Sequence, residues 1–405
     1  FLTEFQKRGY FSQCTDQASL GDLMSKSKIK AYIGFDCTAP SLHVGSLMQI
    51  MCLRLLQKYG HQPIVLLGGG TTLIGDPSGK EETRKILDKK EIDKNIKDIE
   101  NVFKIFLKSK NPKTKPIFVN NFSWLSKLNY INFLRGIGKH FTVNKMLTFD
   151  SVKLRLEREQ SLSYMEFNYM MLQAYDFYEL NKKYKCVLQI GGSDQWGNIV
   201  NGTDLIRRKD KKQTYGLTTP LITVASGTKM GKTEKGAIWL NKKMLSPYDY
   251  WQFWRNTDDK DVINFLKLFT DIDLKQIENL KNANQNINEL KVLLANEATT
   301  LLHGSKAAKD SEITAQKTFG DKSIGKNLPI IKIKKNEIKN GINILDLVMQ
   351  TKLANSKSEV RRMIKNNGLK INNEILKDET KIINQNNFDK ENNMKISHGK
   401  KRHVI

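Results

Sequence analysis

The chain has 405 residues, of which 39% are hydrophobic and 27% are charged, a composition typical of a globular protein with more than one hydrophobic core. No apolar run approaches the roughly 20 residues that span a bilayer, and the first ten residues show no signal or transit pattern, so we expect a cytoplasmic protein without a membrane partner. The formal net charge of +25 favours an anionic partner such as nucleic acid, although a Lys-rich composition from an AT-biased genome gives the same excess. The four cysteines lack metal-ligand spacing, which argues against structural zinc and against any other metal site.

Short apolar runs with strand character alternate with helical patterns from about residue 28 to residue 225. The predicted strands cover residues 30–35, 63–67, 116–119 and 186–190, and the amphipathic segments lie near 43–59, 90–108 and 194–208. This alternation predicts an α/β fold with a doubly wound, parallel, Rossmann-type sheet, which we assign to a catalytic domain at residues 1–225. Ligands bind beyond the carboxyl ends of the strands in such sheets, and three motif-bearing loops converge there.

The rest of the chain divides into two further predicted domains. Ser246-Pro247 opens a helical region, so residues 226–325 are interpreted as a glycine-hinged loop followed by an α-helical domain. Residues 326–340 contain Gly, Pro and Lys and are interpreted as a linker. Residues 341–405 form a small α+β domain, in which Ser356 and Glu359 make a capping box for a helix through Lys365, before two strands that turn at Asn372-Asn373.

Positive charge is concentrated at this C-terminal end. Residues 326–405 contain 18 Lys and Arg against 8 Asp and Glu. Compositional bias alone would spread the excess more evenly, so the distribution favours RNA binding by the last domain. A solvated, Lys-rich tail is the alternative interpretation.

A polar stripe runs along an otherwise apolar helix near residues 164–180. Tyr169, Gln173 and Asp176 lie at positions i, i+4 and i+7, and therefore on one face. Burying them without partners would cost free energy, which suggests that they line a pocket for a polar ligand. The alternative is that the stripe is the solvated face of the helix.

Three loops carry further candidate residues. The Gly-rich segment 68–80 allows close backbone approach to a ligand, and its Asp76 could hold an ammonium group. Residues 226–233 resemble a phosphate-binding P-loop, but Ser226 replaces the first glycine, so we expect instead a mobile loop that presents Lys229 and Lys232 to pyrophosphate. His43 could be an ordinary surface histidine, but it precedes a helix start after the first strand, where phosphate is favoured.

Together these motifs resemble the class I aminoacyl-tRNA synthetases, and within them the bacterial-type tyrosyl enzymes. His43-Val44-Gly45-Ser46 is similar to the His-Ile-Gly-His signature, and Lys229-Met230-Gly231-Lys232-Thr233 to the Lys-Met-Ser-Lys-Ser signature. Further matches are residues 32–36, residues 74–80, the Tyr169/Gln173/Asp176 stripe and residues 191–198. The resemblance extends to the helical domain, near residues 294–304, and to an S4-like RNA-binding module at residues 344–376.

The resemblance implies adenylation of L-tyrosine with ATP and Mg²⁺, followed by transfer to the 3′ end of tRNA(Tyr), in a homodimer with its subunit contact near residues 140–146. It implies tyrosine binding by Tyr32, Asp76, Tyr169, Gln173, Asp176 and Gln195. The implied ATP-binding residues are Gly34, Asp36, Gly45, Gly192, Asp194 and Lys232. The implied catalytic residues are Thr38, His43, Ser46, Lys80, Arg84, Lys229, Lys232 and Thr233, and those that contact tRNA are Arg361, Arg362 and Lys365.

Three residues depart from the family pattern: Ser46 replaces the final His of its signature, Cys37 replaces a frequent Pro, and Ile33 offers no side chain to a ribose. Three other interpretations compete with tyrosine activation. A tryptophan-specific sister enzyme shares both signatures, but an indole gives Asp176 and Tyr32 no phenol to bind. An RNA-binding protein that kept the scaffold would not need His43, Lys229 and Lys232. A P-loop nucleotidase is disfavoured by Ser226.

Overall fold

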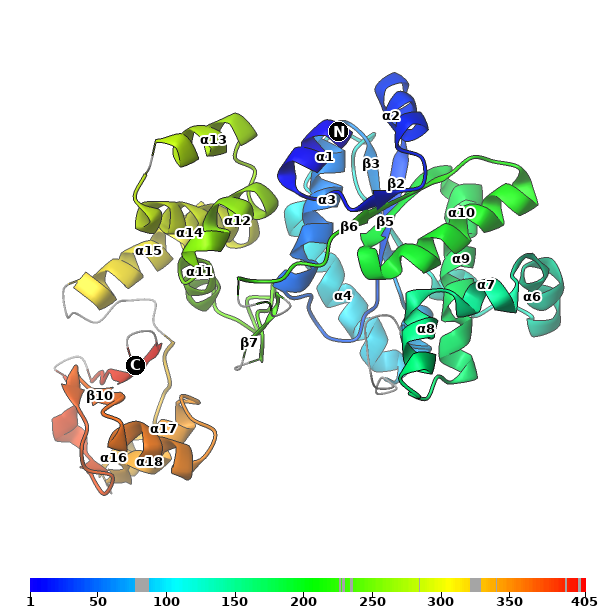
Figure 1. Ribbon diagram of the computed structural model, residues 1–405. Coiled ribbons are helices and arrows are strands. Elements are labelled where there is room, and N and C mark those ends of the chain that lie inside the picture. The colour runs from blue at the N-terminus through cyan, green and yellow to red at the C-terminus, as the bar shows by residue number, and fades with distance from the viewer. Residues whose placement is uncertain are drawn as a thin grey trace. The chain divides into compact units, whose positions relative to one another are not determined.

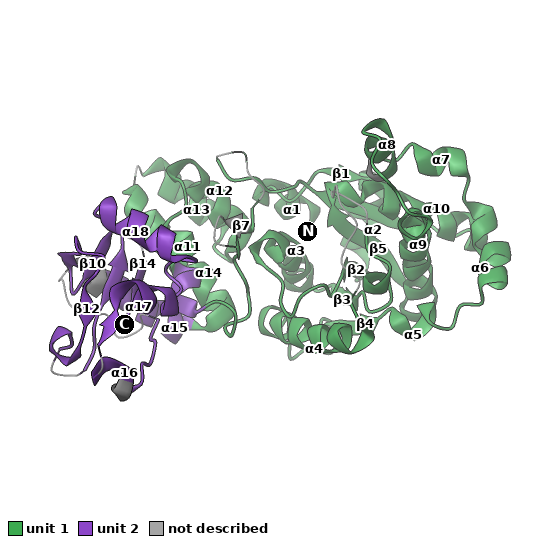
Figure 2. Ribbon diagram, turned by 90° about the horizontal axis from the view of Figure 1, so that it is seen from below, with its two compact units in different colours: residues 1–245, 252–304 green, residues 246–251, 305–405 purple. Residues whose placement is uncertain are grey.

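The computed structural model describes residues 1–76, 87–225, 227, 230–233, 236–283, 285–320, 329–339, 341–389, 392–399 and 402–405. Within these ranges the side chains of residues 150, 151, 232, 233, 317–320, 335 and 336 are not described. The chain forms two compact units, one of residues 1–245 and 252–304 and the other of residues 246–251 and 305–405 (Figure 2). No helix in these described ranges is long and apolar enough to cross a membrane.

A six-stranded sheet is the centre of the first unit (Figure 1). Its strands are β1 (Gln13–Cys14), β2 (Lys30–Phe35), β3 (Gln62–Leu67), β4 (Ile117–Asn120), β5 (Cys186–Gly192) and β6 (Tyr215–Thr219). The spatial order is β1-β6-β5-β2-β3-β4, and every pair is parallel except β1 with β6. The order reverses between β2 and β5, which makes this the switch point of a doubly wound sheet and confirms the predicted fold class.

The four predicted strands agree with β2, β3, β4 and β5 to within two residues, while β1 and β6 were not predicted. β2, β3 and β5 have buried runs with few polar positions, as expected for strands covered on both faces. Short helices α1 (Leu2–Arg8) and α2 (Gln17–Lys26) flank β1 in the chain.

Helices cover both faces of the sheet. Helices α3 (Leu47–Lys58) and α4 (Lys89–Phe106) lie on one side, and α9 (Tyr164–Tyr184) and α10 (Trp196–Asp210) lie on the other (Figure 1). Between β4 and α9 the chain forms four shorter helices, α5 (Phe122–Leu125), α6 (Tyr130–Gly136), α7 (Val143–Leu147) and α8 (Asp150–Glu157).

Helix α9 begins and ends at well-defined caps. The Ser163 hydroxyl accepts the backbone N–H of Glu166, and the Glu166 carboxylate accepts that of Ser163, which completes a capping box. At the other end Lys185 adopts a left-handed conformation with φ of 59° and ends the helix. These caps fix the helix that carries the polar stripe.

The region after residue 246 is helical, as predicted, through α11 (Pro247–Arg255), α12 (Val262–Phe269), α13 (Leu274–Asn282), α14 (Ile287–His303) and α15 (Ser305–Gly320). Ser246 caps α11 by accepting the Asp249 N–H at 3.1 Å. The unit boundary passes through α11 and falls before α15. In the first unit, Trp254 packs against Phe265 and Phe269.

The second unit contains a small α+β core. Its elements are α16 (Lys335–Lys339), β9 (Ile342–Asn343), α17 (Ile344–Gln350), α18 (Lys357–Lys365), β10 (Leu369–Ile371), β11 (Glu374–Ile375), β12 (Ile382–Ile383), β13 (Ile396–His398) and β14 (Arg402–Val404). An antiparallel sheet has the order β11-β10-β13-β14, and β9 pairs with β12. Apolar side chains of α17, α18 and the sheet form one core cluster.

The predicted helix and hairpin of this unit are both present. Ser356 caps α18, because its hydroxyl accepts the Glu359 N–H at 3.2 Å. The Glu359 carboxylate accepts the N–H of Asn355 rather than that of Ser356, so the reciprocal bond of the predicted capping box is displaced by one residue. Asn372 and Asn373 both have positive φ, as a two-residue hairpin turn requires.

Candidate active site

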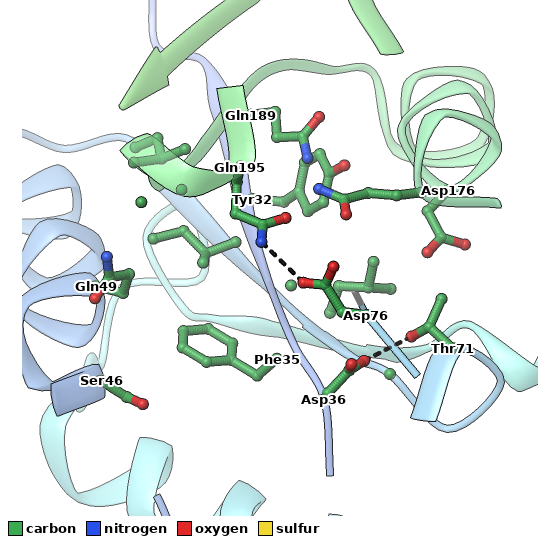
Figure 3. Close-up of a pocket in the computed structure, with 18 of the residues that line it drawn as sticks. Tyr32, Phe35, Asp36, Ser46, Gln49, Thr71, Asp76, Asp176, Gln189 and Gln195 are labelled. Atoms are coloured by element: carbon green, nitrogen blue, oxygen red, sulfur yellow. Dashed lines mark hydrogen bonds between the residues drawn. The ribbon is translucent and has the colours of Figure 1, made fainter. Parts of the chain in front are cut away.

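A cavity of about 310 Å³ opens at the carboxyl ends of β2 and β5, where the strand order reverses. It is lined by residues from β2, from the loop after β3, from α9 and from the turn after β5 (Figure 3). Twelve predicted site residues line it: Tyr32, Gly34, Asp36, Gly45, Ser46, Asp76, Tyr169, Gln173, Asp176, Gly192, Asp194 and Gln195. The structure therefore brings the whole predicted tyrosine-binding set into one cavity.

The polar stripe of α9 faces this cavity. Tyr169 and Asp176 are buried, Gln173 is half-buried, and all three line the cavity. The alternative that the stripe is a solvated helix face is therefore wrong. Buried polar groups of this kind need partners, which Asp176 finds in the protein and Tyr32 does not.

Asp176 is 1% exposed and its two carboxylate oxygens accept one hydrogen bond each. Asn121 Nδ2 donates to Oδ2 at 2.9 Å, and Trp124 Nε1 donates to Oδ1 at 2.7 Å. Burial raises the pKa of Asp176 from 3.8 to about 7, although these two donors lower it, and the charges of Asp36 and Glu179 add to the increase. The carboxylate is thus held in place by neutral donors while its charge is not neutralised.

The Tyr32 hydroxyl is buried and has no hydrogen-bond partner. Its ring packs against Phe177 at 5.3 Å between centroids, which fixes the hydroxyl near α9. Burial and the charge of Asp176 raise the pKa of Tyr32 well above its ordinary value, so the hydroxyl stays protonated and can donate. A protonated donor next to a buried carboxylate is suited to a ligand hydroxyl that accepts from one and donates to the other.

A second group of polar side chains lies around Asp76. Gln195 Nε2 donates to Asp76 Oδ2 at 2.8 Å (Figure 3). Asn198 Nδ2 donates to Gln195 Oε1 at 3.1 Å and to Gln173 Oε1 at 3.0 Å. These contacts orient the two glutamine side chains, because each carboxamide oxygen accepts from Asn198.

Asp36 follows β2 and contacts the loop after β3 and helix α9. Its Oδ1 accepts the Thr71 hydroxyl at 2.9 Å, and the Tyr169 hydroxyl lies 3.3 Å from both of its oxygens. Ser46, at the start of α3, lies across the cavity from Asp176 (Figure 3). The cavity therefore has one end at Asp176 and an opposite side formed by the start of α3.

The first signature segment, residues 43–46, pairs with residues that follow the second signature segment, residues 229–233. Val44 N donates to Ile238 O and Leu240 N to Leu42 O, both at 2.9 Å, so residues 42–44 pair with residues 238–240. The His43 ring meets the Trp239 ring edge to face at 6.2 Å.

Glycine is required where these segments approach most closely. Gly231 has φ of 108°, and a Cβ on it would stand 2.6 Å from His43 Nδ1. A Cβ on Gly45 would stand 2.8 Å from the Met230 carbonyl oxygen. The backbone after Lys229 is thereby seated against the start of α3.

Other predicted residues are placed elsewhere or lie outside the described residues. Lys80, Arg84 and Lys229 lie outside them, and only the backbone of Lys232 and Thr233, in the strand β7 that pairs with β8 (Gly236–Ala237), is described. Thr38 is exposed, His43 is half-buried, and neither lines the cavity. Arg361, Arg362 and Lys365 are exposed on α18 in the second unit.

Sequence reasoning missed several residues that line the cavity or hold its side chains in place. Asn121 and Trp124, which hold Asp176, lie more than 50 residues before it and belong to no motif. Gln189 is buried, its Oε1 has no partner, and it pairs across the sheet with Tyr32. A polar residue within the apolar β5 run was the one available signal for Gln189.

The glycines of the Gly-rich loop also have a packing role that the sequence did not predict. A Cβ on Gly68 would stand 2.5 Å from Thr71 Oγ1 and 2.6 Å from Asp36 Oδ1. A Cβ on Gly69 would collide with Asn120 Oδ1, and one on Gly70 would stand 2.8 Å from Leu125. These three glycines make room for neighbouring side chains, so ligand approach is not needed to explain them.

The chain matches two family models along nearly its whole length. Residues 24–320 match the model described as tRNA synthetases class I (W and Y), and residues 321–405 match the C-terminal domain model described as Tyrosine--tRNA ligase SYY-like. Among curated relatives, the tyrosine--tRNA ligase of Pelagibacter ubique is 66% identical over 404 residues, covering 100% of this chain and 98% of the relative. That of Rickettsia massiliae is 53% identical over 408 residues, covering 100% and 99%.

Solved structures give the same result. A C-terminally truncated mitochondrial tyrosyl-tRNA synthetase of Aspergillus nidulans aligns with a TM-score of 0.71 and 28% identity, covering 78% of this chain and 93% of that one. The corresponding Coccidioides posadasii structure aligns with a TM-score of 0.65 and 30% identity, covering 76% and 90%.

Proposed function

Because the chain belongs to the class I tRNA synthetases of the tryptophan and tyrosine family, and acts as a tyrosine--tRNA ligase, we propose how its cavity carries out that reaction. The reaction joins tyrosine to tRNA at the expense of ATP. Its first step is attack of the tyrosine carboxylate on the α-phosphate of ATP, which releases pyrophosphate and leaves tyrosyl-adenylate. The adenylate then passes its tyrosyl group to a ribose hydroxyl at the 3′ end of tRNA(Tyr), with AMP as the leaving group.

The observation that carries the proposal is the pair formed by Asp176 and Tyr32. The tyrosine phenol donates its proton to the Asp176 carboxylate and accepts from the Tyr32 hydroxyl, which otherwise has no partner. An indole N–H can donate to Asp176 but offers no acceptor, so it would leave the Tyr32 hydroxyl buried and unsatisfied, which disfavours tryptophan as substrate. Rejection of phenylalanine by unpaired buried polar groups is an established example for this enzyme family.

The ammonium and carboxylate of tyrosine occupy the opposite part of the cavity. Asp76, Tyr169 and Gln173 hold the ammonium group, and Gln195 faces the carboxylate. Asp76 and Gln195 already contact each other at 2.8 Å, which supports a site where substrate groups of opposite charge lie side by side. Asp36 lies between the amino acid and the nucleotide, and Gly34, Gly45, Gly192 and Asp194 line the ATP side.

Adenylation needs no general base, because a carboxylate is already a nucleophile. Catalysis therefore consists of positioning and of stabilising charge on the phosphates. We assign this to Thr38, His43 and Ser46 on one side of the nucleotide, and to Lys80, Arg84, Lys229, Lys232 and Thr233 on the other. Mg²⁺ enters with ATP as part of the substrate. The close approach of Gly45 to Met230 and Gly231 supports joint action of the two signatures on one nucleotide.

Binding of tRNA is assigned to the basic C-terminal region. We place the catalytic domain at residues 1–225, the helical domain at 226–325, the linker at 326–340 and the S4-like domain at 341–405. Arg361, Arg362 and Lys365 are exposed on α18, where phosphates can reach them. Phosphate contacts of this kind make affinity fall with increasing salt.

The active protein is proposed to be a homodimer. Of the thirteen large hydrophobic side chains that are exposed in the described part of the chain, seven lie between residues 130 and 164: Tyr130, Ile131, Val143, Leu147, Leu154, Leu156 and Tyr164. Such a concentration on one region is typical of an interface. It includes the segment near residues 140–146 where a subunit contact is expected.

ATP-pyrophosphate exchange with tyrosine, tryptophan and phenylalanine tests the proposed function. Exchange should occur with tyrosine and be at least about a thousandfold slower with phenylalanine. A site that hydrogen-bonds a substrate hydroxyl discriminates strongly against an analogue that lacks it. Exchange with tryptophan would contradict the phenol assignment. No exchange with any amino acid would instead favour an RNA-binding protein that retains the scaffold.

A further inference from the structure

Two carboxylates of the cavity, Asp36 and Asp176, are joined by a continuous chain of hydrogen bonds. The Thr71 hydroxyl donates to Asp36 Oδ1 at 2.9 Å. Asn121 Nδ2 donates to Thr71 Oγ1 at 3.0 Å and to Asp176 Oδ2 at 2.9 Å. Thr71 and Asn121 together therefore span the distance between the phenol end of the cavity and Asp36.

The positions of the protons in this chain are fixed by the surrounding contacts. Asn121 Oδ1 accepts the backbone N–H of Gly70 at 2.7 Å. Exchanging the oxygen and nitrogen of the carboxamide would place its N–H group against the Gly70 N–H, two donors without an acceptor, so this orientation is fixed. Both N–H groups of Asn121 are then used, one on Thr71 and one on Asp176. Because Thr71 Oγ1 accepts from Asn121, its single proton must point to Asp36.

The chain is also shielded from water and closely packed. Thr71 is 3% exposed and Asn121 is fully buried, so neither can exchange its partner for solvent at low cost. Gly68 leaves the space in which Thr71 meets Asp36, since any Cβ there would stand 2.6 Å from Asp36 Oδ1. Displacing one of these hydrogen-bonded side chains therefore displaces the next one.

We propose that the Thr71 hydroxyl is a positioning group that couples recognition of the phenol at Asp176 to the placement of Asp36 beside the nucleotide. A phenol bound to Asp176 steadies this carboxylate against the Asn121 amide, and the second N–H of the amide steadies Thr71. The Thr71 proton then holds Asp36 in the geometry that adenylation requires. This inference rests on the proposed tyrosine activation and adds a role for a residue that need not touch the substrate.

The test compares Thr71→Val with Thr71→Ser in ATP-pyrophosphate exchange. Valine is nearly isosteric but removes the hydroxyl, which leaves a buried N–H of Asn121 without acceptor and Asp36 without its Thr71 donor. We expect kcat/KM for tyrosine to fall about tenfold or more, and kcat/KM for phenylalanine to fall less than about threefold, since phenylalanine does not engage Asp176. Serine keeps the hydroxyl and should retain tyrosine activity within about threefold.

Thr72→Val is the matched control. Thr72 is the adjacent buried threonine, and its hydroxyl accepts the Cys37 N–H at 2.8 Å without joining the two carboxylates. Loss of the Thr72 hydroxyl should lower kcat/KM for pyrophosphate exchange by the same factor with tyrosine and with phenylalanine. If Thr71→Val does the same, or if serine restores nothing, Thr71 is merely structural and the coupling is refuted.

Two other outcomes are distinguishable from these. If thermal unfolding shows that Thr71→Val does not fold, Thr71→Ala and Thr71→Ser provide the same comparison of a lost and a retained hydroxyl. If the unaltered protein fails to exchange pyrophosphate with tyrosine, the proposed function itself is wrong, whatever the Thr71 variants do.

Discussion

Lowering the pH from 8 to 6 should weaken tyrosine binding about tenfold. Asp176 must be ionised to accept the phenol proton, because both its oxygens already face donors, and its pKa in the free protein is about 7. The ionised fraction then falls from about nine-tenths at pH 8 to about one-tenth at pH 6. If only the ionised form binds, the dissociation constant rises by the ratio of these fractions.

Isothermal titration calorimetry with tyrosine across this range measures the effect. Asp176→Asn has no carboxylate to titrate, so its weaker binding should be flat between pH 6 and pH 8. A wild-type affinity that does not change over this range would refute either the pKa of Asp176 or its role as the acceptor of the phenol proton.

The same pKa makes a prediction about folding. Because the pKa of Asp176 rises from 3.8 in the unfolded chain to about 7 in the folded one, the folded state binds the extra proton. Binding of this proton stabilises the folded state fully below about pH 4, and the stabilisation is lost as the pH rises through 7. The loss lowers the free energy of unfolding by about 4 kcal/mol for this side chain. In urea titrations, the unfolding free energy of the wild type should therefore fall relative to that of Asp176→Asn as the pH rises from 5 to 8. A difference independent of pH would contradict this.

Three further changes test other parts of the molecule. Ser46→Ala should lower the adenylation rate with little change in tyrosine affinity; an unaltered rate in stopped-flow measurements would remove Ser46 from the catalytic group. Gly231→Ala should slow adenylation at least about tenfold and spare tyrosine affinity, because a Cβ with φ of 108° would stand 2.6 Å from His43; a normal rate would show that the segment need not seat against His43. Arg8→Met should lower the unfolding free energy by about 3 kcal/mol in urea titrations, because Arg8 donates to Glu4 and to three carbonyl groups at the end of α12; the exposed Lys7→Met is the control, and an equal effect of both would refute this role.

The parallel, doubly wound sheet could be predicted because β2, β3 and β5 are apolar runs bounded by turn residues, whereas the strand order could not. β6 was missed because Tyr215–Thr219 contains a glycine and two threonines, so its burial depends on neighbours that the sequence does not display. β1 has only two residues and exists through its pairing with β6. Such edge strands depend on tertiary contacts more than on local pattern.

The site could be predicted only as far as it is carried by motifs and helix periodicity. The α9 stripe followed from residue spacing, and the structure places it in the cavity. The residues that orient Asp176 could not be found in this way, because Asn121 and Trp124 meet it only after β4 and α9 have packed together. The arrangement of protons between Thr71 and Asn121 likewise depends on the Gly70 N–H, a backbone group without any signal in the sequence.

The glycines at 68–70 have a consequence for mutational scanning of this chain. At these three consecutive positions even alanine would collide with a neighbour, whereas a Cβ on Gly136 would meet nothing within 4 Å. A screen scored by growth would find residues 68–70 as intolerant as reacting groups, although the side chains that need protection are those of Asp36, Asn120 and Leu125. Intolerance in this loop therefore reports excluded volume, and only a substrate-dependent readout separates it from chemistry.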